Sequence, residues 1–210
     1  MKKPEHKTLV LKVDPKQPDE KIIAYAAAGI RYGRLVAFPT ETVYGLAANR
    51  DDRRAVSALY AAKDRPRGKP LTVHVADLAL ITKMGCRLTV PAKALIRKYW
   101  PGPLTLILRS KNGKKIGFRM PANKVAYELI RQAGVPVVAP SANRSGKKAP
   151  IDSRSVLRDL EGRIDMVIDG GKTRVGIEST VVDLTVNPPR ILREGAIGAA
   201  AVLKVVVNYG

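Results

Sequence analysis

Residues 38–46 read Phe38-Pro39-Thr40-Glu41-Thr42-Val43-Tyr44-Gly45-Leu46 and place polar side chains between two apolar runs, 35–38 and 46–48. Pro39 cannot donate a hydrogen bond to a sheet, so it marks the end of a strand that begins at Leu35. We therefore expect residues 40–44 to cross the carboxyl end of that strand. Open α/β sheets bind their ligands at such ends.

A second interpretation of the same stretch stays open at this point. Thr40 or Thr42 can serve only to cap a turn, and Glu41 can be an acidic loop residue in contact with solvent. The stretch alone does not decide between a ligand-binding loop and a capped turn, so the rest of the chain has to.

The composition is that of one ordinary globular domain. The chain has 210 residues, of which 45% are hydrophobic and 27% charged, enough for one substantial core, and we expect a single domain over residues 1–210. The only cysteine, Cys86, cannot form an internal disulfide and is expected to be a small buried residue. Apolar runs are short and residues 1–6 are polar, which predicts a cytoplasmic protein without a membrane segment.

The charge is the unusual bulk property. Thirty-eight Lys and Arg residues against 18 Asp and Glu give a net charge of +20. A field of this sign attracts polyanions, either the phosphates of a nucleotide or a nucleic acid. Adaptation of the whole surface to the host cytoplasm would produce the same count, and the composition leaves that explanation open.

Hydrophobic periodicity predicts strands alternating with helices. The expected strands cover residues 8–13, 35–38, 71–75, 104–108, 116–119, 135–139, 166–168, 176–183 and 190–193. The expected helices cover residues 20–30, 53–63, 77–84, 91–99, 124–132, 156–160 and 196–207. Asn112-Gly113 favours a tight hairpin between two of these strands. The predicted fold class is therefore α/β, with a twisted, open, mixed parallel and antiparallel sheet and helices on its faces.

The strand at 71–75 carries one of the two histidines. Leu71, Val73 and Val75 share one face, which we assign to the core, while Thr72 and His74 share the other. We expect His74 to lie over the sheet rather than to be buried in it, with a partly exposed surface histidine as the alternative.

Polar side chains collect at the ends of several predicted strands. Cations on loops kept irregular by Gly and Pro, beside small hydroxyl and amide groups, suit the oxygens of a triphosphate. Nucleotidyl transfer depends mostly on such positioning and charge stabilisation. No acidic cluster has the spacing of a Mg²⁺ site, so any Mg²⁺ is expected to be held mainly by ATP phosphates, with no metal-binding residues. The segments concerned are 40–44, 63–69, Arg119, 141–143, 179–180 and Arg193.

Motifs over roughly residues 19–197 resemble the YrdC-like family of threonylcarbamoyl-AMP synthases. Each motif is weak alone, but all occur in the family order. The resemblance implies a YrdC-like fold with a positively charged cavity, in the short single-domain form. The motifs are Phe38 to Leu46, Lys63-x-Arg65, Leu71-Thr72-Val73-His74, Pro101-Gly102-Pro103-Leu104-Thr105, Arg119-Met120-Pro121, Ser141-Ala142-Asn143, Ser179-Thr180-Val181-Val182-Asp183 and Leu192-Arg193-Glu194-Gly195.

The resemblance also implies an activity. Such an enzyme is a nucleotidyltransferase that joins L-threonine, bicarbonate or CO₂, and ATP into L-threonylcarbamoyl-AMP and releases pyrophosphate. A tRNA threonylcarbamoyltransferase then uses the product to form threonylcarbamoyladenosine in tRNA, and direct binding of tRNA or double-stranded RNA is a further expectation.

Site residues follow from the resemblance, position by position. The expected catalytic residues are Lys63, Arg65, Ser141 and Asn143. The expected threonine-binding residues are Thr42, His74, Arg119 and Ser179, with Arg119 pairing bidentately with the amino acid's carboxylate. The expected nucleotide-binding residues are Arg65, Lys69, Ser141 and Arg193.

Two other functions remain alternatives. A non-catalytic module that binds double-stranded RNA or tRNA would also carry a charge of +20, although aromatic residues are sparse for such a role. The carbamoyl-transfer module of hydrogenase maturation proteins uses similar loops, but it normally sits in a longer chain with zinc-binding parts, which one cysteine cannot supply.

Overall fold

The computed structural model describes residues 7–207, so the expectation for residues 1–6 lies outside the described residues. Its strands are β1 (Leu9–Lys12), β2 (Val36–Phe38), β3 (Gly45–Asn49), β4 (Thr72–His74), β5 (Leu104–Arg109), β6 (Lys115–Arg119), β7 (Val137–Val138), β8 (Met166–Asp169), β9 (Thr180–Asp183) and β10 (Arg190–Arg193). Its helices are α1 (Glu20–Arg31), α2 (Arg53–Ala62), α3 (Ala79–Lys83), α4 (Val90–Tyr99), α5 (Lys124–Ala133), α6 (Ser153–Leu160) and α7 (Ala199–Val207).

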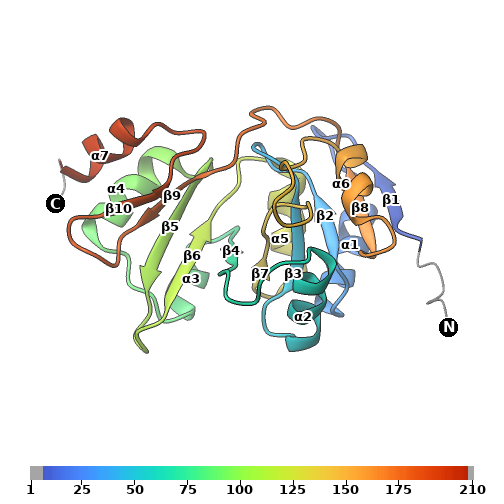
Figure 1. Cartoon of the computed structure of the whole chain (residues 1–210), viewed down its shortest axis with the longest axis horizontal. Coiled ribbons are helices and arrows are strands. Elements are labelled where there is room, and N and C mark those ends of the chain that lie inside the picture. Colours follow the sequence, from blue (N-terminus) through green and yellow to red (C-terminus); the bar gives the residue numbers. More distant parts are fainter. Residues whose placement is uncertain (1–6, 208–210) are drawn as a thin grey trace.

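All described strands belong to one mixed sheet, in the order β1-β8-β2-β3-β7-β4-β6-β5-β9-β10. Pairs β1–β8, β8–β2, β4–β6 and β5–β9 are parallel and the others antiparallel, which confirms the predicted mixed α/β sheet. The hairpin predicted across Asn112-Gly113 is the β5–β6 pair. β1 and α7 lie at opposite ends of the molecule (Figure 1).

Alternation along β2 explains how the sheet is covered on both faces. Val36 and Phe38 pack into a cluster with Leu129 of α5, whereas Ala37 packs on the opposite face in a cluster with Leu59 of α2. All five are buried. Full burial of a side chain such as Phe38 or Leu129 contributes about 1.5–3 kcal/mol each relative to exposure.

Local signals set the ends of the helices. The carboxylate of Asp52 accepts hydrogen bonds from the backbone N–H groups of Arg54 and Ala55, at 2.7 and 3.2 Å, and so begins α2. Asp19 caps α1 in the same manner. Gly134 ends α5 at a φ of 65°, in the left-handed region that glycine tolerates.

One strand was missed by the sequence interpretation. β3 reads Gly-Leu-Ala-Ala-Asn and has neither alternation nor β-branched residues, so its pattern gave no strand signal. All five of its residues are buried because helices cover both faces. β3 pairs antiparallel with β2, so residues 39–44 form the connection between two adjacent strands. The other predicted elements occur, most of them with shifted ends. Among the largest differences are a strand at 180–183 instead of 176–183, a strand at 137–138 instead of 135–139, and helices at 79–83 and 199–207 instead of 77–84 and 196–207.

Candidate active site

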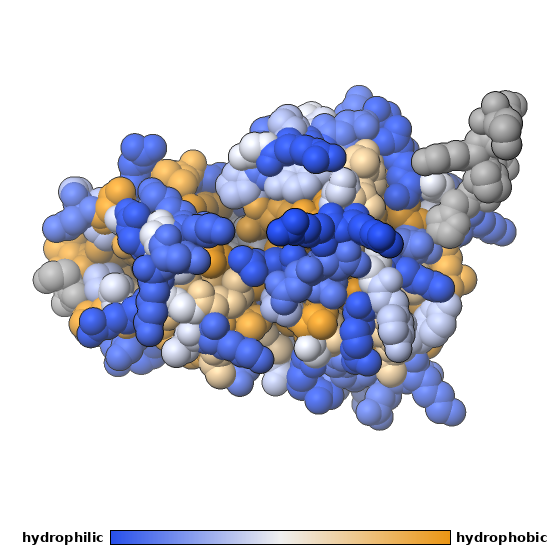
Figure 2. Space-filling view, turned by 90° about the horizontal axis from the view of Figure 1, so that it is seen from below, coloured by the Kyte–Doolittle hydropathy of each residue, from blue (hydrophilic) through white to orange (hydrophobic). Residues whose placement is uncertain are grey.

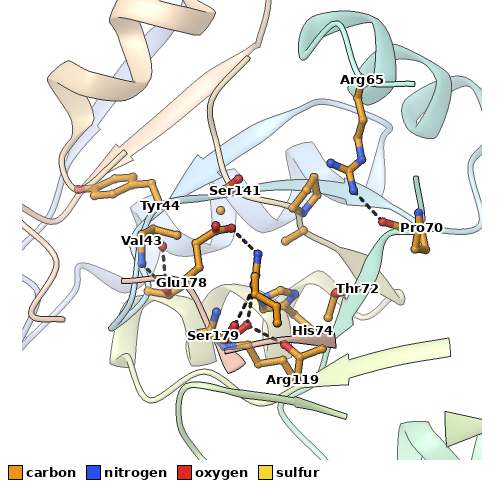
Figure 3. A pocket seen from close by; sticks show the side chains of 16 residues that line it. Val43, Tyr44, Arg65, Pro70, Thr72, His74, Arg119, Ser141, Glu178 and Ser179 are labelled. Carbon is orange, nitrogen blue, oxygen red and sulfur yellow. Dashed lines mark hydrogen bonds and ion pairs between the residues drawn. The ribbon is translucent and has the colours of Figure 1, made fainter. Parts of the chain in front are cut away.

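A cavity lies where the 39–44 connection meets the ends of β4, β6, β9 and β10 and the loop after β7 (Figure 3). Its empty space, measured out to the open mouth, is about 610 Å³. Six of the predicted site residues line it: Arg65, His74, Arg119, Ser141, Ser179 and Arg193. The sheet therefore brings together groups that are far apart in the sequence.

The 39–44 connection is both a capped turn and a wall of this cavity. The hydroxyl of Thr40 donates to the backbone oxygen of Val43 at 2.7 Å and accepts from the N–H of Thr42 at 3.2 Å, so Thr40 shapes the turn. Thr40 and Val43 also line the cavity. The alternative of a solvated Glu41 is wrong, since its side chain is only 2% exposed.

Glu41 forms a buried ion pair with Arg119. The distance from Arg119 Nη2 to Glu41 Oε1 is 2.9 Å, and the two side chains are 6% and 2% exposed. Arg119 Nη2 also donates to the hydroxyl of Thr42 at 2.7 Å, and Nε donates to the oxygen of Gly102 at 3.4 Å. Burial lowers the pKa of Arg119 and the carboxylate of Glu41 opposes that shift. A charge this buried needs its partner, so Glu41 fixes the orientation of the guanidinium.

The contacts of Arg119 bear on the expected bidentate pair with a substrate carboxylate. Among the described residues, none accepts a hydrogen bond from Nη1. Nη2 already donates to the hydroxyl of Thr42 and forms the ion pair with Glu41. A ligand carboxylate therefore finds Nη1 free, and a bidentate pair requires Nη2 to be shared. Thr42 itself contacts Arg119 and is absent from the cavity lining.

His74 lines the cavity from β4 but is buried, at 3% exposure, so the expectation that it is not buried is wrong. Strands β7 and β6 flank β4. The ring of Phe38 packs edge-on against His74, with centroids 6.2 Å apart. Burial and the positive charge of Arg119 lower the pKa of His74 to about 3, so the ring is neutral at neutral pH. Its Nδ1 has no hydrogen-bond partner in the described part of the chain.

Lys63 and Asn143 do not line the cavity but hold the loop that carries Ser141. The ammonium of Lys63, 1% exposed, donates to the backbone oxygens of Ser141 and Asn143. The side-chain amide of Asn143 donates to the oxygens of Arg144 and Lys147, at 3.1 and 2.7 Å. Burial and the positive charge of nearby Arg65 lower the pKa of Lys63 to about 8. Lys63 and Asn143 are absent from the lining, and their contacts hold the loop that presents Ser141.

Ser179 and Arg193 form the opposite side of the cavity. The hydroxyl of Ser179 lies 2.9 Å from that of Thr105 and accepts from Arg193 Nη2 at 3.2 Å. Arg193 Nη1 donates to Glu178 Oε1 at 2.7 Å. Lys69, in contrast, is exposed and is not among the lining residues. The structure therefore does not bring Lys69 to the other predicted site residues.

Metal ligands do not converge here. Within residues 7–207, no group of three or more His, Cys, Asp or Glu side chains is arranged to hold a metal ion. No helix in this range is both long and apolar enough to cross a membrane. Cys86 is buried, as predicted.

The family model Sua5_yciO_yrdC, described as telomere recombination, matches residues 28–195. The chain belongs to the Sua5/YciO/YrdC family. It is 42% identical to the threonylcarbamoyl-AMP synthase of Pyrococcus abyssi over 208 residues, covering 95% of this chain and 61% of the relative. It is 44% identical to that of Bacillus subtilis over 185 residues, covering 83% and 54%. The chain thus spans little more than half the length of these two relatives.

A solved structure of a family member agrees in fold. The structure of P. abyssi Sua5 complexed with L-threonine superposes with a TM-score of 0.90 at 42% identity, covering 94% of this chain and 61% of that one. The YrdC-like architecture expected from the motifs is thereby confirmed.

Several lining residues of the Sua5/YciO/YrdC chain were not among the predicted site residues, and Tyr44 and Glu178 are two of them. Tyr44 donates from its hydroxyl to the oxygen of Gly171 at 2.6 Å, and Glu178 pairs with Arg193. Both lie beside residues that the motifs had singled out, since Tyr44 is in the 38–46 stretch and Glu178 precedes Ser179. The only signal in the sequence that could have found Tyr44 and Glu178 was that each lies close in sequence to a residue already predicted to belong to the site.

Proposed function

We propose that this protein is a nucleotidyltransferase that makes L-threonylcarbamoyl-AMP and pyrophosphate from L-threonine, bicarbonate or CO₂, and ATP. The observation that carries the proposal is a single cavity lined by Arg65, Arg119 and Arg193, in a chain 42% identical to a protein whose structure was solved with L-threonine. Three guanidinium groups around small hydroxyls suit a carboxylate and phosphates together.

The residues divide between the two ligands. Nη1 of Arg119 is directed to the threonine carboxylate, with Thr42 and Glu41 holding the guanidinium in place. Arg65 and Arg193 neutralise phosphate charge, and Ser141 offers a hydroxyl on the same cavity wall. Lys63 and Asn143 act by fixing the loop that carries Ser141.

The chemistry then needs little beyond positioning. The threonine α-ammonium first loses a proton to solvent. The neutral amine then adds to CO₂ and releases a second proton to give a carbamate, and a carbamate oxygen forms the new bond to the α-phosphorus of ATP as the bond to pyrophosphate breaks. Holding reactants together can lower a barrier by about 7–11 kcal/mol. Mg²⁺ held by the ATP phosphates would add charge neutralisation, and Glu178 is the one carboxylate-bearing residue that lines the described cavity.

Wider expectations belong to the same proposal. The product serves a tRNA threonylcarbamoyltransferase for tRNA modification in the cytoplasm. The net charge of +20 is the one observation that favours the nucleic-acid-binding module. Hydrophilic residues spread across the face shown in Figure 2 rather than forming one band. Direct binding of tRNA or double-stranded RNA is compatible with catalysis.

A product assay tests the proposal. The protein is incubated with labelled bicarbonate, ATP and each of the twenty amino acids in turn, and labelled aminoacyl-carbamoyl adenylate is detected. We expect product with L-threonine. Salt-sensitive RNA binding without product from any amino acid would favour the non-catalytic module instead, and product with another amino acid alone would change the substrate.

A further inference from the structure

Glu178 is the feature of the cavity that the proposed roles leave without a task. It is the only carboxylate-bearing residue among the described residues that line the cavity, where Arg65, Arg119 and Arg193 supply positive charge. Figure 3 shows its side chain pointing into the cavity, between Ser141 and Ser179 in this view. Its side chain is 40% exposed, so a ligand can reach it.

The backbone at Glu178 is held firmly. The N–H of Ala196 donates to the oxygen of Glu178 at 2.9 Å. Gly195 passes so close that a Cβ there would lie 2.2 Å from that same oxygen and 2.7 Å from the oxygen of Ser179. Because backbone atoms cannot move aside as a flexible side chain can, only glycine fits. The side chain of Glu178 therefore extends from a fixed backbone position.

The carboxylate still has free hydrogen-bonding capacity. Among the described residues, only Arg193 hydrogen-bonds to it, through Oε1 at 2.7 Å. An ionised carboxylate accepts at both oxygens, at about four lone-pair positions. Oε2 is thus available to a donor that enters the cavity.

An amino acid brings such a donor. In the proposed function its carboxylate pairs with Nη1 of Arg119, which leaves an α-ammonium in a cavity lined by three guanidinium groups. A like charge so placed is unfavourable unless a carboxylate compensates it. Glu178 is near enough for its negative charge to oppose the lowering of the pKa values of Arg65 and Arg119.

We propose that Glu178 accepts hydrogen bonds from the α-ammonium of the substrate amino acid and thereby makes the site selective for amines. The inference rests on the proposed function and adds the group that recognises the nitrogen. In this arrangement Arg119 and Glu178 bind opposite charges of one zwitterion, and the hydrogen bond from Arg193 orients the carboxylate of Glu178.

The simpler role for Glu178 is an ion pair that joins the start of β9 to β10. Pairs as exposed as Glu178 and Arg193, at 40% and 42%, contribute only about 0–1 kcal/mol to stability. Such a role makes no difference to which ligands bind. Amine selectivity is therefore the readout that separates the two roles.

The experiment measures equilibrium binding of L-threonine and of 3-hydroxybutanoate, which is threonine without its amino group, by titration calorimetry without ATP. It uses the intact protein, Glu178→Gln, and Glu194→Gln as a matched control. Glu194 lies nearby in sequence and is exposed, and it is not among the lining residues. Its Oε1 accepts from the N–H of Ala199, a bond that Gln can keep. Thermal unfolding checks that each variant is folded.

We expect Glu178→Gln to bind L-threonine about tenfold to hundredfold more weakly, since hydrogen bonds to charged groups are the strong ones. Its affinity for 3-hydroxybutanoate should stay within about twofold, and Glu194→Gln should match the unaltered protein for both ligands. A Glu178→Gln variant that keeps its preference for threonine overturns the inference, as does one that loses affinity for both ligands to the same extent. If the unaltered protein binds no threonine and forms no product, the proposed function fails as well.

Discussion

Two walls of the cavity are built in opposite ways. The buried wall consists of residues 40–44 and Arg119, and the basic loop consists of residues 65–70. In the buried wall, Thr40, Glu41 and Thr42 are each at most 3% exposed. In the basic loop, residues 66–70 are all exposed, and Arg65 holds its place with a hydrogen bond from Nη2 to the oxygen of Pro70 at 2.9 Å.

The two regions differ in how much a bound ligand has to order them. The charges of the buried wall are already paired and oriented, so a ligand that binds there orders little. Arg65 is buried at Nε without a hydrogen-bond partner in the described residues, so its guanidinium is less fully paired than the charges of the buried wall. Substitutions in the buried wall should therefore destabilise the fold, whereas substitution of Arg65 in the basic loop should affect turnover alone.

The largest expected effect tests the buried wall. Glu41→Ala leaves Arg119 charged and unpaired, which should lower the free energy of unfolding by about 3–5 kcal/mol. Urea denaturation measures it. The control is Glu128→Ala, which removes an exposed pair with Arg131 and should cost under about 1 kcal/mol. Equal losses in the two variants would contradict a specially stabilised wall.

The next effect tests the basic loop. Arg65→Ala should reduce kcat/KM for pyrophosphate release by about 10²–10³, as expected when one charge-stabilising donor is removed, with unfolding midpoints unchanged. Arg67→Ala is the matched control, since Arg67 is exposed and contacts Ser57 instead of the cavity. Near-normal turnover in Arg65→Ala would remove this residue from the site.

A smaller effect concerns pH and His74. Its pKa is about 3 when folded and 6.5 otherwise, so the unfolded chain binds the proton first. Stability contributed by neutral His74 is present above pH 6.5 and is lost as the pH falls toward 3. Between pH 7 and 5 the loss should be on the order of 1–2 kcal/mol. Urea unfolding at both pH values should show this difference, and His74→Gln should reduce it. An unchanged pH dependence in that variant would mean that His74 titrates normally.

The smallest expected effect is at Lys69. Because it is exposed and outside the lining, Lys69→Ala should change pyrophosphate release by less than about twofold. A loss of pyrophosphate release comparable to that of Arg65→Ala would show that Lys69 contacts the nucleotide. The basic loop would then contribute more than Arg65 to the site.

Most of the fold could be predicted from the sequence because a helix or strand with one exposed face has a periodic hydrophobic pattern, and because β-branched residues recur in other strands. β3 was not predicted because its sequence, Gly-Leu-Ala-Ala-Asn, is buried on both faces and therefore shows no alternation of polar and apolar residues. Motif positions brought six predicted residues to one cavity. The motifs could not predict which side chains are buried. Lys63 and His74 are buried because strands and loops remote in sequence close around them, and the pairing of Glu41 with Arg119 joins positions 78 residues apart.

Release of pyrophosphate from ATP, measured with each reactant omitted in turn, tests the central claim most directly. The account predicts release only when L-threonine, bicarbonate and ATP are all present. Release that continues without threonine or bicarbonate, or no release from the complete mixture, would contradict it.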